Sequence, residues 1–211
     1  MLDKMRCYIV GAGEFDESVL PRSGDFVIAA DGGFSYLHEH EIEPDLIVGD
    51  FDSMPADLME AVYKHPNVIR VSSEKDDTDM LLAVREGLKL GYKEFAINGG
   101  LGGKLDQTYA NIQILTFIAE NAATGVLYGK NNCVTAIKDS SLELNPGSAK
   151  GKSVSIFSAE KQAQGVTLSG LLYPLDNADV TNYYPGVSNE FTDKPAMITV
   201  VKGTLIIMWE K

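Results

Sequence analysis

The pattern of apolar residues changes once along the chain, and this change constrains the fold more than any other feature of the sequence. Up to about residue 120, short apolar runs typical of buried strands alternate with segments whose apolar residues have helical spacing. One example is the run 94–98, followed by the helical pattern of residues 106–120. This alternation predicts a mostly parallel sheet with helices packed on its faces.

After Ala123-Thr124-Gly125, helical periodicity nearly disappears. Strand-like runs follow one another, for example at residues 133–137, 154–157 and 205–209, with Gly, Pro, Asn and Asp between them. This pattern predicts an antiparallel β-sandwich or barrel. We therefore expect an α/β fold in two parts, an α/β domain over residues 1–123 and an all-β domain over residues 124–211.

Composition narrows the possible partners and the cellular location. The chain has 211 residues and a net charge of −12, which disfavours binding to nucleic acid or anionic membranes. It contains no apolar run long enough to span a membrane, and residues 1–6 have no signal-peptide core. Cys7 and Cys133 lie in apolar runs, as buried thiols do. These features favour a cytoplasmic protein.

The acidic residues gather in two short stretches, and the first follows the apolar run 46–49. If the chain stays extended through Phe51, Asp50 and Asp52 point the same way, roughly 7 Å apart. Two such carboxylates repel unless a cation lies between them, and Mg²⁺ accepts one or two carboxylates together with water and phosphate. A solvated turn after a buried strand explains the pair equally well.

The second acidic stretch is Lys75-Asp76-Asp77-Thr78-Asp79, directly before a helical pattern over about residues 80–88. Asp76 is available as the N-cap, with Asp79 at the third helical position. Three Asp residues in four exceed what capping needs, and Asp76 and Asp79 can face one point. Lys75 would supply a cation for a phosphate, so we favour a functional role over capping alone.

Residues 99–107 combine four glycines, a lysine and the start of a helix. Free backbone N–H groups, the helix dipole and the Lys104 ammonium together predict an anion site, most simply for phosphate. The stretch is not a Walker A loop, because Asn98 stands where that pattern has Gly and Leu105 where it has Ser or Thr.

Two further glycine pairs follow predicted strands. Asp31-Gly32-Gly33 would let a ligand approach the backbone, although Asp31 could simply cap a helix. Gly11-Ala12-Gly13 opens a dinucleotide fingerprint, but Asp16 replaces its third glycine, so we favour a tight structural turn. These clusters all follow strands, and ligands of parallel sheets bind beyond the carboxyl ends of strands.

In the second part of the chain, residues 173–190 form the longest irregular stretch. It contains Tyr173, Tyr183, Tyr184, Ser188 and Asn189. Aromatic and small polar side chains in a long loop suit an organic ligand or a subunit contact, and ordinary loop packing explains them equally.

Four stretches in fixed order resemble the thiamine pyrophosphokinase family. They are Asp31-Gly32-Gly33, Gly49-Asp50-Phe51-Asp52-Ser53, Lys75-Asp76-Asp77-Thr78-Asp79 and residues 99–107, with a weaker likeness at Gly170-Leu171 and Gly186-Val187-Ser188-Asn189. The resemblance implies an α/β domain followed by a β-sandwich, in a homodimer whose active sites lie between protomers. It also implies transfer of the pyrophosphoryl group of ATP, with Mg²⁺, to the hydroxyl of thiamine, giving thiamine diphosphate and AMP.

The resemblance also implies roles for individual residues. The expected metal-binding and catalytic acids are Asp50, Asp52, Asp76 and Asp79, with Asp106 as a further catalytic candidate and Asp79 or Asp106 as the general base. The expected ATP-binding residues are Asp31, Gly32, Lys75, Thr78, Gly99, Gly100, Gly102, Gly103, Lys104 and Gln107. The expected thiamine-binding residues are Tyr173, Ser188 and Asn189.

The chain departs from the family pattern at three of these positions. Lys104 stands where many members have Arg, which keeps the charge but loses the bidentate fork. Gln107 stands where bacterial members often have His, and Tyr173 where we expect Trp in animal relatives. Two other functions stay open: a glycosyltransferase that uses Asp50-Phe51-Asp52 as a D-x-D site for a nucleotide sugar, and a non-enzymatic sensor of thiamine or nucleotide.

Overall fold

The computed structural model describes residues 5–52, 54–72 and 77–211. The helices are α1 (Gly33–Glu39), α2 (Ala56–Lys64), α3 (Asp79–Lys89), α4 (Leu105–Glu120) and the 3₁₀ turn η1 (Gly147–Ala149). The strands of the first half are β1 (Cys7–Val10), β2 (Phe26–Ala30), β3 (Leu46–Gly49), β4 (Val68–Arg70), β5 (Glu94–Asn98) and β6 (Thr124–Tyr128). The later strands are β7 (Asn132–Lys138), β8 (Ser141–Leu144), β9 (Ser153–Ser158), β10 (Gln162–Ser169), β11 (Leu175–Thr181), β12 (Gly186–Glu190), β13 (Ala196–Thr199) and β14 (Thr204–Glu210).

The chain divides into two compact units. The first contains the described residues up to Asn111 together with Leu127–Lys130. The second contains Ile112–Val126 and Asn131–Lys211. The division falls within α4 and β6, so both units include parts of these two elements.

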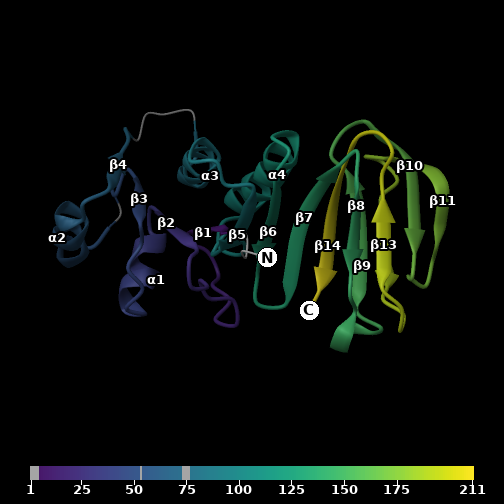
Figure 1. The fold of residues 1–211 in the computed structure, drawn as a ribbon, viewed down its shortest axis with the longest axis horizontal. Helices are drawn as coiled ribbons and strands as arrows, with labels where there is room; N and C mark the ends of the chain where they lie inside the picture. The colour runs from purple at the N-terminus through teal and green to yellow at the C-terminus, as the bar shows by residue number, and fades with distance from the viewer. Residues whose placement is uncertain (1–4, 53, 73–76) are drawn as a thin grey trace. The chain divides into compact units, whose positions relative to one another are not determined.

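In the first unit, five strands pair in parallel in the order β5-β1-β2-β3-β4, as Figure 1 shows. Strand β1 lies between β2 and β5, with Cys7 opposite both Phe26 and Phe95. Every residue of β1 and β3 is buried, as expected for strands covered on both faces. The parallel sheet predicted from the strand-helix alternation is confirmed.

Helices pack on both faces of this sheet. Successive strand residues point to opposite faces, so Tyr8 and Val10 share one face, where they form a core with Phe34 and Leu37 of α1. On the other face, α3 lies so close that a Cβ atom on Gly87 would approach the Cys7 Sγ to 3.0 Å. The same added atom would lie 2.6 Å from the Phe95 ring. Gly87 therefore allows α3 to pack directly against β1 and β5.

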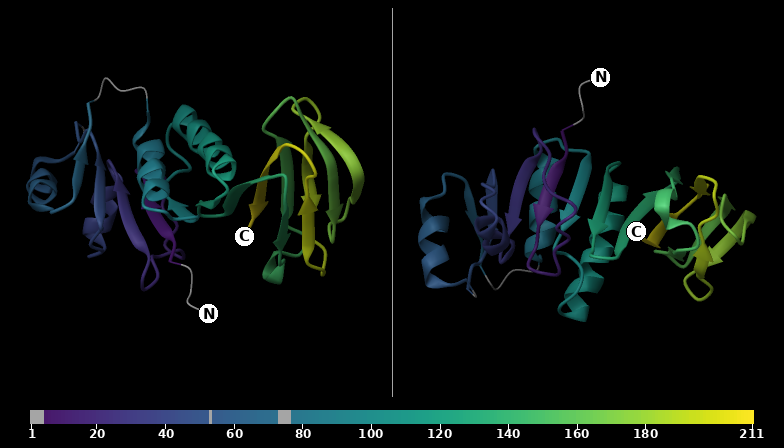
Figure 2. Two further views of the ribbon diagram at one scale, coloured as in Figure 1. Left: turned by 45° about the horizontal axis from the view of Figure 1, so that its top comes forward. Right: turned by 90° about the horizontal axis from the view of Figure 1, so that it is seen from below.

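The second unit contains two antiparallel sheets, seen again in the two views of Figure 2. One consists of the strands β12-β9-β14-β7, which are the antiparallel part of a ten-stranded sheet, and the other is a four-stranded sheet in the order β11-β10-β13-β8. Alternate residues of β9, among them Val154 and Ile156, are buried and join a core with Leu168, Ile198 and Ile207 from both sheets. This arrangement confirms the predicted antiparallel domain.

One prediction for this unit is wrong: residues 173–190 are not irregular. They contain β11 and β12, and Tyr183 and Tyr184 lie between these two strands. Strand β11 was missed because Leu-Asp-Asn-Ala-Asp-Val-Thr lacks the alternation of apolar and polar residues. It is an edge strand, paired only on one side with β10 among the described strands, so polar side chains suit it.

Both cysteines are free and buried, as the sequence predicted. Burial raises the pKa of the Cys7 thiol well above its ordinary range, and the nearby carboxylates Asp25 and Asp45 raise it further. No helix within the described ranges is both long and apolar enough to cross a lipid bilayer.

Candidate functional site

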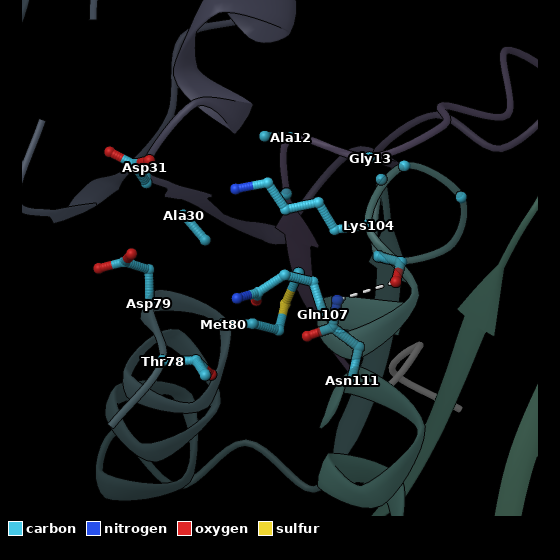
Figure 3. A pocket seen from close by; sticks show the side chains of 15 residues that line it. Ala12, Gly13, Ala30, Asp31, Thr78, Asp79, Met80, Lys104, Gln107 and Asn111 are labelled. Carbon is cyan, nitrogen blue, oxygen red and sulfur yellow. Dashed lines mark hydrogen bonds between the residues drawn. The ribbon is translucent and has the colours of Figure 1, made fainter. Parts of the chain in front are cut away.

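The first unit contains a cavity of about 440 Å³ beyond the carboxyl ends of β1, β2 and β5, within the size range of small-molecule sites. Figure 3 shows the side chains around it. It is lined by Gly11, Ala12, Gly13, Ala30, Asp31, Thr78, Asp79, Met80, Gly99, Gly100, Gly102, Gly103, Lys104, Gln107 and Asn111. The cavity therefore lies where a parallel sheet is expected to bind a ligand.

Two backbone loops form one wall of the cavity. Residues 11–14 follow β1, residues 99–103 follow β5, and hydrogen bonds between backbone atoms join the two loops. The bonds are Gly11 N to Asn98 O at 2.8 Å, Gly13 N to Gly99 O at 2.6 Å, and Glu14 N to Leu101 O at 2.7 Å. Both loops are thus held as a single backbone surface.

Glycine is required where the two loops meet. Gly99 has a φ of +68°, and a Cβ atom there would lie 2.2 Å from the carbonyl oxygen of Gly11. A Cβ atom on Gly13 would lie 2.4 Å from the carbonyl oxygen of Leu101. Gly103 also has a positive φ, +67°, but an added Cβ atom would meet nothing within 4 Å. Gly99 therefore serves close packing of the loops, whereas Gly103 serves backbone conformation alone.

Asn98, the last residue of β5, forms side-chain hydrogen bonds to residues next to this wall. Its side-chain oxygen accepts hydrogen bonds from the backbone N–H groups of Asp16 at 2.9 Å and Gly99 at 3.0 Å. Its amide nitrogen donates to the Asp16 carbonyl at 3.0 Å and to the Tyr8 hydroxyl at 3.2 Å. Asn98, one of two residues that separate this stretch from a Walker A pattern, thus ties the start of the loop after β5 to the segment at Asp16.

Acidic side chains lie on the opposite side of the cavity from Asn111, and Figure 3 shows Asp31 and Asp79 there. Burial raises the pKa of Asp31 above its ordinary value of 3.8, and the charges of Asp79 and Asp50 raise it further. Hydrogen bonds from backbone N–H groups, including that of Phe51 at 3.3 Å, oppose the shift. Asp31 is therefore close enough to both Asp79 and Asp50 to be repelled by their charges.

The chain does not stay extended through Phe51, so the condition under which Asp50 and Asp52 would point the same way is not met. Strand β3 ends at Gly49, and Phe51 has a left-handed φ of +62°. This turn buries the Phe51 side chain, and the Asp52 N–H donates to the Asp50 carboxylate at 3.1 Å. Asp50 consequently lies near Asp31, whereas Asp52 is exposed in the turn and neither residue lines the cavity.

Helix α3 starts with Thr78 as its N-cap, so the capping role that the sequence left open to Asp76 belongs to Thr78. The Thr78 hydroxyl oxygen accepts from the backbone N–H of Leu81 at 3.2 Å. Asp79 is the first helical residue, and both Thr78 and Asp79 line the cavity. Asp76 and Lys75 lie outside the described residues.

Lys104, directly before α4, and Gln107, in the first turn of α4, both line the cavity. Figure 3 shows the Lys104 side chain extending toward the side where Asp31 lies. The Thr108 hydroxyl donates to the Gly102 carbonyl at 3.0 Å and ties the loop to the helix. Asp106 is exposed, does not line the cavity, and accepts a hydrogen bond from the Gln107 backbone N–H at 2.9 Å.

The two sides of the cavity have complementary chemistry. The glycine loops, the α4 N-terminus and Lys104 suit an anion such as phosphate. Asp31 and Asp79, with Asp50 near Asp31 but outside the lining, suit a divalent cation, because a bound cation would relieve the repulsion on Asp31. Among the described residues, no group of three or more His, Cys, Asp or Glu side chains is arranged to hold a metal ion. Mg²⁺ does not need such a cage, since it takes one or two carboxylates and completes its shell with water and phosphate. The residues present therefore fit a magnesium nucleotide.

Comparison with known families agrees with this order of parts. A family model described as the catalytic domain of thiamin pyrophosphokinase matches residues 19–126. A second, described as the vitamin B1 binding domain of the same enzyme, matches residues 139–205. The chain belongs to the thiamine pyrophosphokinase family.

Relatives with known names extend the comparison. A thiamine pyrophosphokinase of Bacillus subtilis is 27% identical over 183 residues, which are 86% of this chain and 85% of the relative. The crystal structure of a B. subtilis thiamine pyrophosphokinase superposes with a TM-score of 0.84 at 25% identity, covering 98% of this chain and 99% of that one. A 6-hydroxymethyl-7,8-dihydropterin pyrophosphokinase of Pyrococcus furiosus is 42% identical over 91 residues, covering 41% of this chain and 38% of the relative.

The residues expected to bind thiamine lie in the part matched by the family's vitamin B1 binding domain. Tyr173 is exposed, and both polar groups of its backbone bond to the buried side chain of Asn189, at 2.9 Å and 2.7 Å. Ser188 is exposed with a φ of +56°, and its N–H donates to the Ser155 hydroxyl at 3.1 Å. In this member of the thiamine pyrophosphokinase family, Asn189 thus fixes the backbone that carries Tyr173.

Most of the expected ATP-binding residues surround one cavity. The structure brings together Asp31, Thr78, Gly99, Gly100, Gly102, Gly103, Lys104 and Gln107, and with them the expected catalytic acid Asp79. Of the other described candidates, Gly32, Asp50, Asp52 and Asp106 do not line it. Sequence reasoning missed Gly11, Ala12, Gly13, Ala30, Met80 and Asn111 as lining residues. The glycine pair at 11 and 13 was a visible signal, but nothing in the local pattern of α4 distinguishes Asn111.

Proposed function

We propose that this protein is a thiamine diphosphokinase, which transfers the pyrophosphoryl group of ATP to the hydroxyl of thiamine and releases AMP. The observation that carries the proposal is the ordered match of the catalytic and vitamin B1 binding domains to the two halves of the chain. The cavity in the first unit supports it, because one wall suits phosphate and the opposite side suits a divalent cation.

In this reaction the thiamine hydroxyl oxygen attacks the β-phosphorus of ATP, and the bond from that phosphorus to the oxygen of AMP breaks. The transition state is loose, so catalysis depends mainly on positioning and charge stabilisation. The glycine-loop N–H groups and Lys104 bind phosphate oxygens and stabilise charge on the transferred group. Asp79 is the better candidate for accepting the hydroxyl proton, since it lines the cavity and Asp106 does not.

Asp31, Asp79 and Asp50 would hold Mg²⁺, with Asp52 and Asp76 as further ligand candidates from the family resemblance. When bound, Mg²⁺ neutralises phosphate charge and orients the phosphate oxygens. Burial is the main cause of the raised pKa of Asp31, and the charges of Asp79 and Asp50 add to it. The contribution of these two charges supports the assignment, because a bound cation would relieve it.

The acceptor is the part of the proposal with a serious rival. The likeness to a pyrophosphokinase for 6-hydroxymethyl-7,8-dihydropterin points to the same group transfer with a pterin alcohol. We favour thiamine because the vitamin B1 binding domain matches residues 139–205, and because a chain with net charge −12 attracts the thiamine cation. Membership of the family favours neither a glycosyltransferase nor a sensor.

Product analysis tests the reaction. Incubation of the protein with Mg²⁺, ATP and thiamine should give AMP and thiamine diphosphate in equal amounts, measured by anion-exchange chromatography. Omission of Mg²⁺ in the presence of a chelator should stop the reaction. Formation of ADP, or no turnover under conditions in which the protein binds ATP, would contradict the proposal.

We propose that the protein acts as a cytoplasmic homodimer with active sites shared between protomers. Several large side chains of the second unit are exposed, including Tyr183 at 78% and Tyr184 at 82%, and a subunit contact would bury them. Light scattering after gel filtration should give twice the 22.9 kDa of one chain. A monomeric mass at micromolar concentration would contradict this assembly.

A further inference from the structure

Asn111 carries a buried side-chain oxygen that no described residue pairs with by a hydrogen bond. The residue is only 8% exposed and lines the cavity. Its amide nitrogen donates to the Gly100 carbonyl at 2.8 Å, the bond drawn in Figure 3. Only the NH₂ group can donate to a carbonyl, so this bond fixes which end of the amide remains unpaired. The unpaired end is a hydrogen-bond acceptor.

The acidic side chains of the cavity lining lie away from Asn111. Figure 3 shows Asn111 on the same side of the cavity as Gln107 and away from Asp31 and Asp79. Met80, which also lines the cavity, is apolar and 6% exposed. A buried acceptor without a partner costs free energy, so a ligand that offers a donor gains by binding there. Phosphate oxygens are themselves acceptors and would be repelled.

The donors of ATP are its ribose hydroxyls and the 6-amino group of adenine. The amino group is the donor farthest from the phosphates along the nucleotide. Asn111 follows Lys104 by seven residues, about 10 Å along the helix axis. A nucleotide whose phosphates lie at Lys104 and the glycine loops can therefore place its base, and not its phosphates, at Asn111.

We propose that the side-chain oxygen of Asn111 accepts a hydrogen bond from the 6-amino group of adenine and so selects ATP over GTP. Guanine carries a carbonyl oxygen at that position, which would place two acceptors against each other. Asn111 is thus a specificity-determining residue. This inference rests on the proposed function, because it takes ATP as the phosphate donor.

The test combines a change in the ligand with a change in the protein. Binding of ATP and of purine riboside triphosphate, which lacks the 6-amino group, is measured by titration calorimetry with Mg²⁺ and without thiamine. The natural protein should bind ATP about 5- to 150-fold more tightly, the range expected when a buried acceptor loses its partner. In Asn111→Leu the ratio should fall to near one. Gln113→Leu makes the same change at an exposed position of α4 and should keep the natural ratio.

Several results would overturn the inference. One is a ratio near one in the natural protein, and another is a ratio unchanged in Asn111→Leu. A third is a loss of affinity for 2′- or 3′-deoxy-ATP in place of the amino-free analogue, which would assign the oxygen to ribose. Circular dichroism shows whether Asn111→Leu folds. If it does not, the test is the natural protein's affinity for the three nucleotides: tighter binding of ATP than of purine riboside triphosphate and GTP supports the inference, and equal binding contradicts it.

The two proposals can fail separately. Discrimination in binding without formation of thiamine diphosphate would leave the inference standing and contradict the proposed function. Formation of thiamine diphosphate at equal rates from ATP and purine riboside triphosphate would leave the proposed function standing and contradict the inference about Asn111.

Discussion

Asp31 combines three unfavourable features at one residue: a φ of +46°, partial burial, and two neighbouring carboxylates. Structures keep such residues where function requires them. Asn tolerates the same backbone conformation and can still accept the hydrogen bond from the Phe51 N–H, so Asp31→Asn isolates the charge.

Asp31→Asn should raise the melting temperature at pH 7 when Mg²⁺ is absent. Burial and Asp79 raise the pKa of Asp31 above 3.8, so the folded state binds more protons than the unfolded state above that pH. Stability of the natural protein therefore falls as pH rises through this window and stays lower above it. The advantage of the variant should shrink as pH is lowered toward 4, in thermal denaturation followed by circular dichroism. Destabilisation at pH 7 would contradict the electrostatic account.

Asp79→Asn should lower kcat by on the order of 10²-fold, because it removes a carboxylate at the reacting end of the cavity. Its thermal stability should not fall. Asp77→Asn is the matched control two residues earlier, where the carboxylate forms an ion pair with Arg85 at 2.6 Å. Ion pairs of this exposed kind contribute little, so the control should keep nearly full turnover. Equal losses in both variants would remove Asp79 from the reaction.

At the scale of elements, the sequence predicted most of the strands, the helices and the glycine loop, because each of these has a local signal. The bounds of β3 and β5 match the expected runs, and α4 begins one residue before the predicted start. The turn at Phe51 could not be predicted, since it depends on burial of that ring in a core that distant elements supply. The N-cap at Thr78 could not be predicted either, because the three neighbouring Asp residues are equally suitable caps. The sequence does not show which of these side chains accepts the hydrogen bond from the Leu81 N–H.

Substitution by alanine should reduce stability by different amounts at Gly99 and Gly103, which both lie in the loop that follows β5. Gly103→Ala costs only the left-handed conformation, about 1–2 kcal/mol, because an added Cβ atom meets nothing within 4 Å. Gly99→Ala adds a contact at 2.2 Å with the Gly11 carbonyl oxygen, so the joined loops must move apart. A loss of 1 kcal/mol corresponds to about 2–4 °C in a chain of this size.

Thermal denaturation of both variants measures this difference. Gly99→Ala should lose clearly more stability than Gly103→Ala and should also bind ATP more weakly, since it disturbs the whole wall. Similar melting temperatures for the two variants would show that the loops are not held together as the structure has them.

At the scale of the whole molecule, the single change of pattern near residue 123 predicted a parallel α/β part followed by an antiparallel β part. The cavity followed partly from topology, because the loops after β1, β2 and β5 meet at one edge of the sheet. The role inferred for Asn111 could not be predicted from topology, because it depends on one side-chain oxygen that packing leaves buried without a hydrogen-bond partner among the described residues. Likewise, the polar strand β11 acquires its place by pairing with β10 and not by its own pattern.

The central claim is that the first unit supplies pyrophosphoryl transfer and the second supplies selection of thiamine. Because one relative is a pyrophosphokinase for a pterin alcohol, the choice of acceptor is the part of this claim that an experiment can contradict most directly. The most direct measurement gives the protein Mg²⁺ and ATP with thiamine and 6-hydroxymethyl-7,8-dihydropterin, singly and together, and follows AMP and both diphosphate products. We predict that AMP forms with thiamine and that the pyrophosphoryl group is found on thiamine alone. AMP formation with the pterin and not with thiamine would contradict the account.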